Sequence, residues 1–328
     1  MTEASSTRAI IAAFLANLGI AVLKFIGFLI TGAASMLAES VHSVADTGNQ
    51  GLLILGGRRG RQGPDEEHPF GYGRERYFWA FLVAVVLFTV GSVYALYEGI
   101  EKLRHPHELT NPPVAIAILL GAIALESWSL RTAVREASHI RGDYSWWSFI
   151  RHTKNPELPV VLLEDLGALI GLAFALVGIG LAVITDNPRF DALGSVAIGL
   201  LLGVIAVVIG TEMRSLLIGE AATSADVAAI REALTGTEGV RRLIHLRTMH
   251  LGPDELLVAG KIELDPAFTF AQVSETINRA EARIRAAVEV GTLIYLEPDV
   301  YREPADKATA SDGPVDRAAP GAAGTPTP

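Results

Sequence analysis

A few polar side chains interrupt long apolar runs of the sequence, and these are the positions where chemistry is expected. His42 and Asp46 are four residues apart in the second apolar run, and Asn49 and Gln50 follow one turn later. On a helix this spacing places the side chains on one face. An imidazole nitrogen and a carboxylate oxygen are a partial ligand set for zinc or another divalent ion. The alternative is a hydrogen bond between His42 and Asp46 that stabilises a helix contact.

A second candidate pair lies in the fifth apolar run, where Glu164 and Asp165 are adjacent within a stretch of Leu and Val. Adjacent residues of a helix point about 100° apart, so at least one of these acids must face the interior of a bundle. We expect one to be a ligand and the other to be a supporting polar group or a proton carrier. The alternative is that one carboxylate pairs with Lys24 or Arg131.

Ionisable side chains at membrane depth favour a functional interpretation, because each costs about 2.5–3.5 kcal/mol on insertion scales. Glu39 lies one turn before His42 and could support that side chain. We expect Glu126 to be structural, and Lys24 could neutralise an acid in an empty site.

The composition places the chain in a membrane. Hydrophobic residues make up 50% and charged residues 19%, against roughly 25% charged residues in soluble proteins. The mean hydropathy is +0.36. Cysteine is absent, so any metal site must be built from nitrogen and oxygen atoms. The net charge of −9 argues against nucleic acid as a partner, because phosphate binding needs clustered Lys and Arg.

Residues 1–217 contain apolar runs long enough to cross the ~30 Å hydrocarbon core of a bilayer. We therefore expect an all-α bundle of six transmembrane helices. Lys and Arg concentrate in the loops after the second and fourth runs, which predicts that both termini are cytoplasmic. The six expected spans are approximately Ala9–Ile30, Ser35–Leu55, Tyr77–Tyr97, Val114–Val134, Val160–Ile184 and Leu193–Ile218.

Residues 218–303 have the pattern of a small cytoplasmic α+β domain, and residues 304–328 have the composition of a disordered tail. Amphipathic helices and alternating strands follow one another in the order α-β-β-α-β. This order suits a ferredoxin-like layout, in which helices cover one face of a small sheet. The expected elements are Ser224–Leu234, Val240–Leu251, Glu255–Leu264, Phe270–Val288 and Thr292–Glu297.

These features together resemble the cation diffusion facilitator family of divalent-metal/proton antiporters, in particular its zinc and iron branch. Besides the two pairs and the α-β-β-α-β domain, the chain carries His-Pro-Phe-Gly-Tyr-Gly-Arg-Glu-Arg over residues 68–76, before the third span. The resemblance implies a transporter and not an enzyme. It implies efflux of zinc, or of iron, manganese or cobalt, by proton antiport through alternating access. It also implies a homodimer, with no cofactor besides the transported ion.

The resemblance implies a tetrahedral transport site with two ligands from the second span and two from the fifth. His42, Asp46 and Asp165 match three of these positions. The remaining position is Val161, which cannot bind a metal ion. Glu164, Asn49, Gln50 or a water molecule could supply the fourth ligand.

Two accessory metal sites of the family are only partly matched. In the loop before the third span, Asp65 and His68 match two ligands, but the third position is Tyr72. In the cytoplasmic domain, Glu297 is the single acid that could bind a metal. His245 and His250 are offset from the family's ligand positions and should face opposite sides of a strand. The ligand positions of that domain correspond to Ile244, Lys261, Ser274 and Tyr295.

Two other classes of function compete with transport. A membrane-embedded metalloenzyme needs a motif such as His-Glu-x-x-His, which does not occur in the spans. A non-transporting membrane scaffold or metal sensor would explain the departures at Val161 and Tyr72. For a transporter, the short loops favour the inner membrane of a bacterium.

Overall fold

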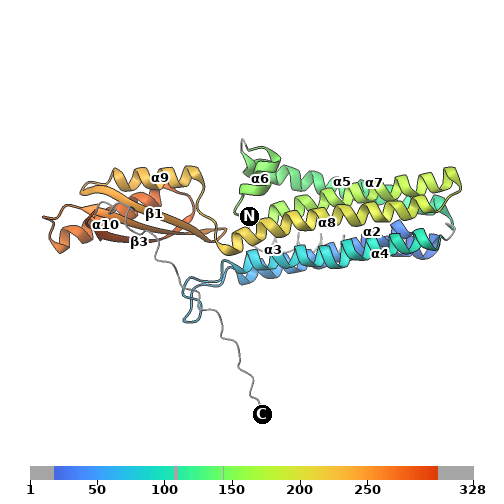
Figure 1. The fold of residues 1–328 in the computed structure, drawn as a ribbon, viewed down its shortest axis with the longest axis horizontal. Coiled ribbons are helices and arrows are strands. Elements are labelled where there is room, and N and C mark those ends of the chain that lie inside the picture. Colours follow the sequence, from blue (N-terminus) through green and yellow to red (C-terminus); the bar gives the residue numbers. More distant parts are fainter. Residues whose placement is uncertain (1–17, 107–109, 143, 302–328) are drawn as a thin grey trace, which may run out of the picture.

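A computed structural model of the chain describes residues 18–106, 110–142 and 144–301. It has a region of long helices followed by a small α+β domain with one sheet. The two parts lie end to end, so the described chain is elongated along the direction of the helices (Figure 1). The start of the first expected span and the expected tail at 304–328 lie outside the described residues.

The long helices follow the apolar runs of the sequence. The helix α3 is followed directly by a π-helical segment, η1, and then by α4. These three elements form one continuous helix. The elements of this region are a helix at Leu18–Thr31, α2 at Ala34–Arg59, α3 at Glu75–Val86, η1 at Leu87–Val93, α4 at Tyr94–Arg104, α5 at Pro112–Arg141, α7 at Glu157–Thr185 and α8 at Arg189–Ile218.

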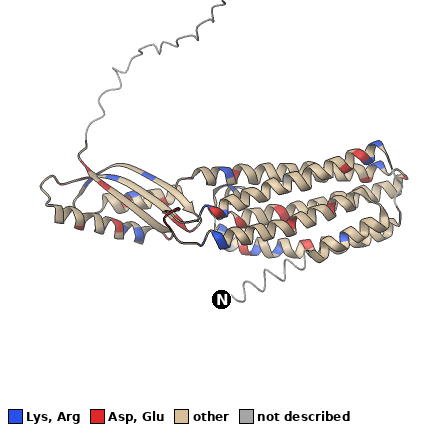
Figure 2. Ribbon diagram, turned by 90° about the horizontal axis from the view of Figure 1, so that it is seen from below, with Lys and Arg blue, Asp and Glu red and all other residues tan. Residues whose placement is uncertain are grey.

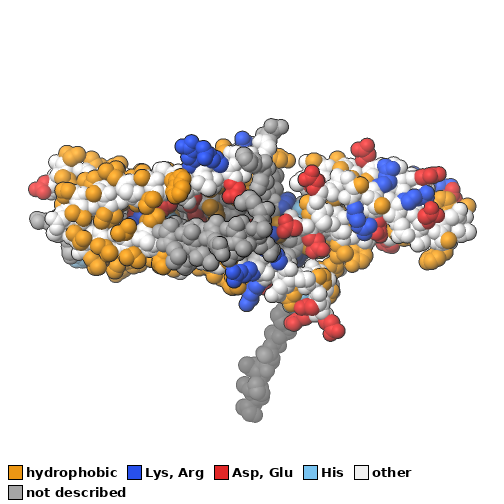
Figure 3. Space-filling view, turned by 180° about the vertical axis from the view of Figure 1, so that it is seen from behind, with side chains coloured by type: hydrophobic (Ala, Val, Ile, Leu, Met, Phe, Trp, Pro, Cys, Tyr) orange, Lys and Arg blue, Asp and Glu red, His pale blue; other side chains and the backbone are white. Residues whose placement is uncertain are grey.

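Four of these helices are long and apolar enough to cross a membrane, counted over the described residues. They are Glu75–Arg104, Pro112–Ser138, Glu157–Thr185 and Arg189–Ile218, while Leu18–Thr31 is a shorter apolar helix. The helix α2 has 26 residues and carries the polar side chains from Glu39 to Gln50. Hydrophobic side chains cover the helical region, and charged side chains are frequent on the α+β domain (Figure 3). This distribution is that of a membrane-embedded bundle with a water-exposed domain.

Small residues allow the helices to approach closely. A Cβ atom on Gly178 of α7 would lie 2.9 Å from the carbonyl oxygen of Phe190 on α8. Across the contact between η1 and α8, the Ser92 hydroxyl donates a hydrogen bond to the Gly199 carbonyl oxygen at 2.7 Å. Close backbone approach and side-chain hydrogen bonds are the means by which helices associate in lipid.

Asp191, in the first turn of α8, holds the start of α2 in place. Its carboxylate accepts hydrogen bonds from the Ala34 N–H at 2.7 Å, the Ser35 N–H at 3.2 Å and the Ser35 hydroxyl. The residue before α2 is Ala33, which has no polar side chain to cap the helix. Asp191 therefore supplies the cap from another helix and fixes the position of α2 against α8.

A short helix that the sequence did not predict, α6 at Trp146–His152, lies between α5 and α7. It stands on the outside of the bundle, at the end from which the α+β domain extends (Figure 1). The Ser145 hydroxyl accepts a hydrogen bond from the Ser148 N–H at 3.1 Å, which caps the helix.

The C-terminal domain has the predicted order of elements, and its sheet has the strand order β1-β2-β3. The strands β1 and β2 are antiparallel, and β3 runs parallel to β2 because α10 makes the crossover. Buried side chains of α9, α10 and β2 form the core, among them Ile230, Val258 and Ile284. The elements are α9 at Ser224–Thr235, β1 at Val240–Gly252, β2 at Glu255–Leu264, α10 at Phe270–Ala287 and β3 at Gly291–Asp299.

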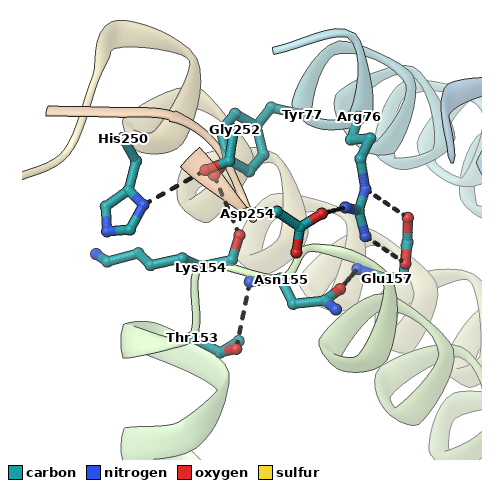
Figure 4. Close-up of polar contacts among 9 residues, drawn as sticks. All are labelled: Arg76, Tyr77, Thr153, Lys154, Asn155, Glu157, His250, Gly252 and Asp254. Carbon is teal, nitrogen blue, oxygen red and sulfur yellow. Dashed lines mark hydrogen bonds and ion pairs between the residues drawn. The ribbon is translucent and has the colours of Figure 1, made fainter. Parts of the chain in front are cut away.

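The turn between β1 and β2 contacts the end of the helical region (Figure 4). The Arg76 guanidinium on α3 pairs with the Asp254 carboxylate in this turn at 2.7 Å. The same guanidinium makes two 2.9 Å hydrogen bonds to the Glu157 carboxylate at the start of α7. Arg76 thus joins two helices and the sheet, in the two-point geometry that suits a guanidinium and a carboxylate.

Candidate metal centre

A small cavity lies between the Leu18–Thr31 helix, α2, α5 and α7. Its volume is about 10 Å³, which is space for a single water-sized sphere. Four carboxylates lie along its wall, and charged positions are otherwise few along the middle of the helices (Figure 2). The residues that line it are Ile20, Ser43, Asp46, Gln50, Glu126, Val161, Glu164 and Asp165.

The helix α2 presents His42 and Asp46 on one side, as their spacing predicted. The His42 Nδ1 atom lies 3.4 Å from the Asp46 Oδ1 atom, and the His42 side chain is fully buried. Within the described residues, neither nitrogen of the His42 ring has a hydrogen-bond partner. Buried polar atoms are normally paired, so the Nε2 atom of His42, which has no partner among the described residues, is available to a ligand.

The helix α7 presents two acids, Glu164 and Asp165, to the cavity in two different directions. The Asn49 amide donates a hydrogen bond to the Glu164 Oε1 atom at 2.7 Å, which directs Glu164 towards α2. The Ser129 hydroxyl donates one to the Asp165 Oδ2 atom at 3.0 Å, which directs Asp165 towards α5. Ser129 was not identified from the sequence, although it lies one turn after Glu126 and therefore on the same face of α5.

Lys24 is fully buried and reaches acids of α2 and α5. Its ammonium nitrogen lies 3.1 Å from the Glu39 Oε2 atom, 2.7 Å from the Ser43 hydroxyl and 3.9 Å from the Glu126 Oε1 atom. Lys24 thus neutralises buried acids, as the sequence suggested, but its partners are Glu39 and Glu126. It does not pair with the Glu164–Asp165 dyad in the described structure.

The predicted ligands are near one another but do not form a complete coordination shell. Asp46 and Asp165 line the same cavity, whereas His42 lies one turn along α2 and does not line it. Over the described residues, no group of three or more His, Asp or Glu side chains is close enough to share a metal ion. Of the three candidates for a fourth ligand, Glu164 and Gln50 face the cavity, while the Asn49 amide is bonded to Glu164.

The carboxylate of Asp65 is already bonded within its loop. It accepts hydrogen bonds from the Tyr72 hydroxyl at 2.7 Å and from the His68 N–H at 2.6 Å. The Tyr72 hydrogen bond is the main reason that the pKa of Asp65 lies below its usual value. The His68 Nδ1 atom lies 3.7 Å from the carboxylate, and both side chains are exposed. Tyr72 therefore acts here as a partner of Asp65 within the loop.

In the C-terminal domain, Glu297 is paired with a lysine. The Lys261 ammonium lies 2.9 Å from the carboxylates of both Glu297 and Asp299. The hydrogen bond to Asp299, followed by that to Glu297, raises the pKa of Lys261. His245 is exposed and His250 is buried, in agreement with the expectation that they face opposite sides.

Comparison with known proteins places both parts of the chain in one family. Residues 10–218 match the cation efflux transmembrane domain, and residues 222–299 match the cytoplasmic domain of cation efflux proteins. The first match covers the bundle with its cavity, and the second covers the sheet with α9 and α10.

Relatives with assigned names occur in animals, plants and bacteria. The mitochondrial proton-coupled zinc antiporter SLC30A9 of Mus musculus is 32% identical over 74% of this chain and 43% of its own length. Metal tolerance protein C4 of Arabidopsis thaliana is 30% identical over 86% of this chain and 62% of its own. The cation-efflux pump FieF of Serratia proteamaculans is 26% identical over 84% of this chain and 87% of its own.

The chain spans less than half the length of the mouse antiporter. The two domain matches, however, cover nearly all of the described residues. The chain belongs to the cation diffusion facilitator family.

Proposed function

We propose that this protein exports divalent metal cations, zinc foremost, in exchange for protons by alternating access. The observation that carries the proposal is the cavity between α2, α5 and α7, into which Asp46, Glu164 and Asp165 project. Concentrated negative charge inside an apolar bundle is costly unless a cation or protons offset it. The names of the zinc antiporter and of the cation-efflux pump among the relatives support the same assignment.

The proposed transport site consists of His42, Asp46 and Asp165 with one further oxygen ligand. Glu164 is our first choice for that ligand because it lines the cavity and is held there by Asn49. A set of one nitrogen and three oxygens binds zinc, and it discriminates weakly against iron, manganese and cobalt. Val161 forms an apolar part of the wall.

The same side chains can take either the cation or protons. A histidine binds a metal through a neutral nitrogen, and a carboxylate binds it in the ionised form. Protons that enter from the outer side would therefore displace the metal ion there. The metal-free protein would return to the inward-facing state with protons on these acids. Export of the metal ion and import of protons would thus be coupled without a separate path for protons.

The arrangement in the membrane is part of the proposal. We propose six spans, made by Leu18–Thr31, α2, α3 with α4, α5, α7 and α8, and cytoplasmic termini. The C-terminal domain would join two copies of the chain, as the family resemblance implies. A bacterial cell membrane is the proposed location, and the bacterial pump among the relatives supports it.

The function is tested in vesicles that contain the purified protein and a zinc-sensitive dye. Zinc uptake into the vesicle should require an opposing proton gradient and should dissipate that gradient. Asp46→Asn and Asp165→Asn should each abolish uptake, because each removes a charged ligand. Asp265→Asn is the control, since Asp265 lies in the C-terminal domain and pairs with Arg241. Normal uptake by both Asp46→Asn and Asp165→Asn would refute the proposed site.

A further inference from the structure

The short helix α6 is held against the outside of the bundle by one buried side chain. Phe149 is nearly inaccessible and belongs to an apolar cluster with Ala133 and Ala137 of α5 and Leu162 of α7. Phe149 thus fixes α6 at one height along the helices.

That height is the boundary between the apolar part of the bundle and water. The cluster partners on α5 lie in the last turns of its apolar stretch, which ends at Ser138. The partner on α7 lies just after Leu158, where the apolar run of that helix begins. In a bilayer this level corresponds to the headgroups and the upper part of the acyl chains.

The exposed side chains of α6 and of the segment before it are aromatic. Tyr144 is 54% exposed, Trp146 is 40% exposed and Trp147 is 55% exposed. Exposed clusters of large aromatic side chains are unusual on a water-facing surface. Tryptophan and tyrosine are enriched at the interface between membrane and water, where the ring is buried and the polar N–H or O–H group reaches water.

Two guanidinium groups accompany these rings. The Arg141 guanidinium carbon lies 4.8 Å from the centre of the Trp146 ring, and that of Arg151 lies 5.9 Å from the centre of the Trp147 ring. Cation–π contact at this distance orients the side chains. Arg151 also pairs with Glu212 of α8 at 3.2 Å. Guanidinium groups bind phosphate in two-point geometry, and an acidic membrane surface attracts basic groups that lie near it.

We propose that α6 with its flanking residues is a membrane-surface anchor that binds the headgroups of acidic phospholipids. Trp146 and Trp147 would lie at the level of the glycerol groups, and Arg141 and Arg151 would contact the phosphates. Its position at the boundary, its exposed aromatic rings and its two guanidinium groups together identify this occupant. The proposal is independent of which ion the bundle carries.

The first test locates Trp147 in the membrane. The chain has four tryptophans, so replacing Trp79, Trp128 and Trp146 by Phe leaves Trp147 as the single reporter. The full-length protein is placed in vesicles of phosphatidylcholine and phosphatidylglycerol. Lipids brominated near the glycerol should quench its fluorescence more strongly than lipids brominated near the chain end, and aqueous iodide should quench it weakly.

The second test measures the contribution of charge with the tryptophans intact. Phosphatidylglycerol, compared with phosphatidylcholine alone, should raise the melting temperature of the wild-type protein. Arg141→Gln and Arg151→Gln should each reduce this lipid-dependent increase. Arg285→Gln is the matched control, because the Arg285 side chain is 53% exposed, against 55% for Arg151, and lies on α10 of the C-terminal domain.

Three results would overturn the proposal. Strong quenching of Trp147 by iodide would show that the helix faces water. Protection from both iodide and brominated lipid would show that protein covers it, as a second copy of the chain would. An unchanged effect of phosphatidylglycerol in both arginine variants would exclude a role for the headgroup charge.

Discussion

At the scale of single residues, the buried ammonium of Lys24 is a counter-charge to two acids of the bundle, Glu39 and Glu126. It lies within 4 Å of both Glu39 and Glu126 and donates a hydrogen bond to Ser43. Removing one member of a buried ion pair leaves the other charge without a partner, which typically costs about 3–5 kcal/mol. Lys24 therefore stabilises the bundle next to the proposed transport site.

Lys24→Met should lower the thermal stability of the purified protein strongly, because Glu39 loses its charged partner. The double variant Lys24→Met with Glu39→Gln should recover a substantial part of the loss, since it removes the unpaired charge as well. Melting curves of the two variants in the same detergent provide the comparison. A double variant as unstable as Lys24→Met alone would mean that the unpaired charge of Glu39 is not the cause of the lost stability.

The sequence predicted one part of the candidate site and missed another. The shared face of His42 and Asp46 follows from helical spacing alone, and the Glu164–Asp165 dyad was visible as charge in an apolar run. The hydrogen bonds from Asn49 to Glu164 and from Ser129 to Asp165 were not predictable. They depend on how α2, α5 and α7 are rotated against one another, which the spacing within one helix does not determine.

At the scale of elements, α7 makes room for the buried acid of α2. A Cβ atom on Gly171 would lie 2.5 Å from the Glu39 Oε1 atom, which is closer than a real contact allows. The absence of a side chain at Gly171 lets Glu39 reach Lys24. A Cβ atom on Gly180 of the same helix would have no neighbouring atom within 4 Å among the described residues.

Gly171→Ala should destabilise the protein by about 1–3 kcal/mol, the usual cost of an extra methyl group in a packed site. It should also reduce zinc uptake, because Glu39 must move away from Lys24. Gly180→Ala is the matched control and should be neutral in both assays. Melting temperature and vesicle uptake measured side by side check this, and equal behaviour of the two variants would contradict the packing seen at Gly171.

Element boundaries were well predicted wherever a periodic pattern was long. The spans at α7 and α8 and all five elements of the C-terminal domain were placed within four residues of their ends, whereas α5 continues seven residues beyond the predicted end at Val134. The helix α6 was missed because its seven residues mix aromatic, polar and basic side chains and give no clear period. The π-helical segment η1 was also unpredicted, since its sequence is mostly apolar and fits an ordinary helix.

At the scale of the whole molecule, the hairpin of β1 and β2 is attached to the helices that carry the cavity. Arg76 bonds both Asp254 in the hairpin and Glu157 at the start of α7. The His250 N–H donates a hydrogen bond at 2.8 Å to the carbonyl oxygen of Glu220, whose side chain pairs with Lys154. The C-terminal domain is therefore bonded, through Arg76, to the start of α7, two turns from Glu164.

This attachment should weaken in acid through His250. Burial, and then the nearby charge of Lys154, lowers the pKa of His250 below its usual 6.5, against the opposing effects of the hydrogen bond to Gly252 and of the charges on Asp226 and Glu220. His250 therefore has a lower pKa in the folded chain than in the unfolded chain. At a pH between these two pKa values, His250 is protonated in the unfolded chain but not in the folded chain. The free energy of unfolding must then fall as the pH drops below about 6.5.

His250→Gln should reduce the loss of stability that accompanies a shift from about pH 7.5 to about pH 5.5. Melting temperatures of the wild-type protein and the variant at both pH values measure this difference. His245→Gln is the control, because His245 is an exposed residue of the same strand. An identical pH dependence in the wild-type protein and in His250→Gln would exclude His250 as the source.

The central claim is that a divalent cation binds between α2 and α7. X-ray anomalous scattering at the zinc edge, from crystals grown with zinc, tests it most directly. A peak is predicted about 2.0–2.2 Å from a His42 nitrogen and from oxygens of Asp46 and Asp165, which are ordinary zinc–ligand distances. Peaks confined to the Asp65 loop or to Glu297, with none between α2 and α7, would contradict the claim.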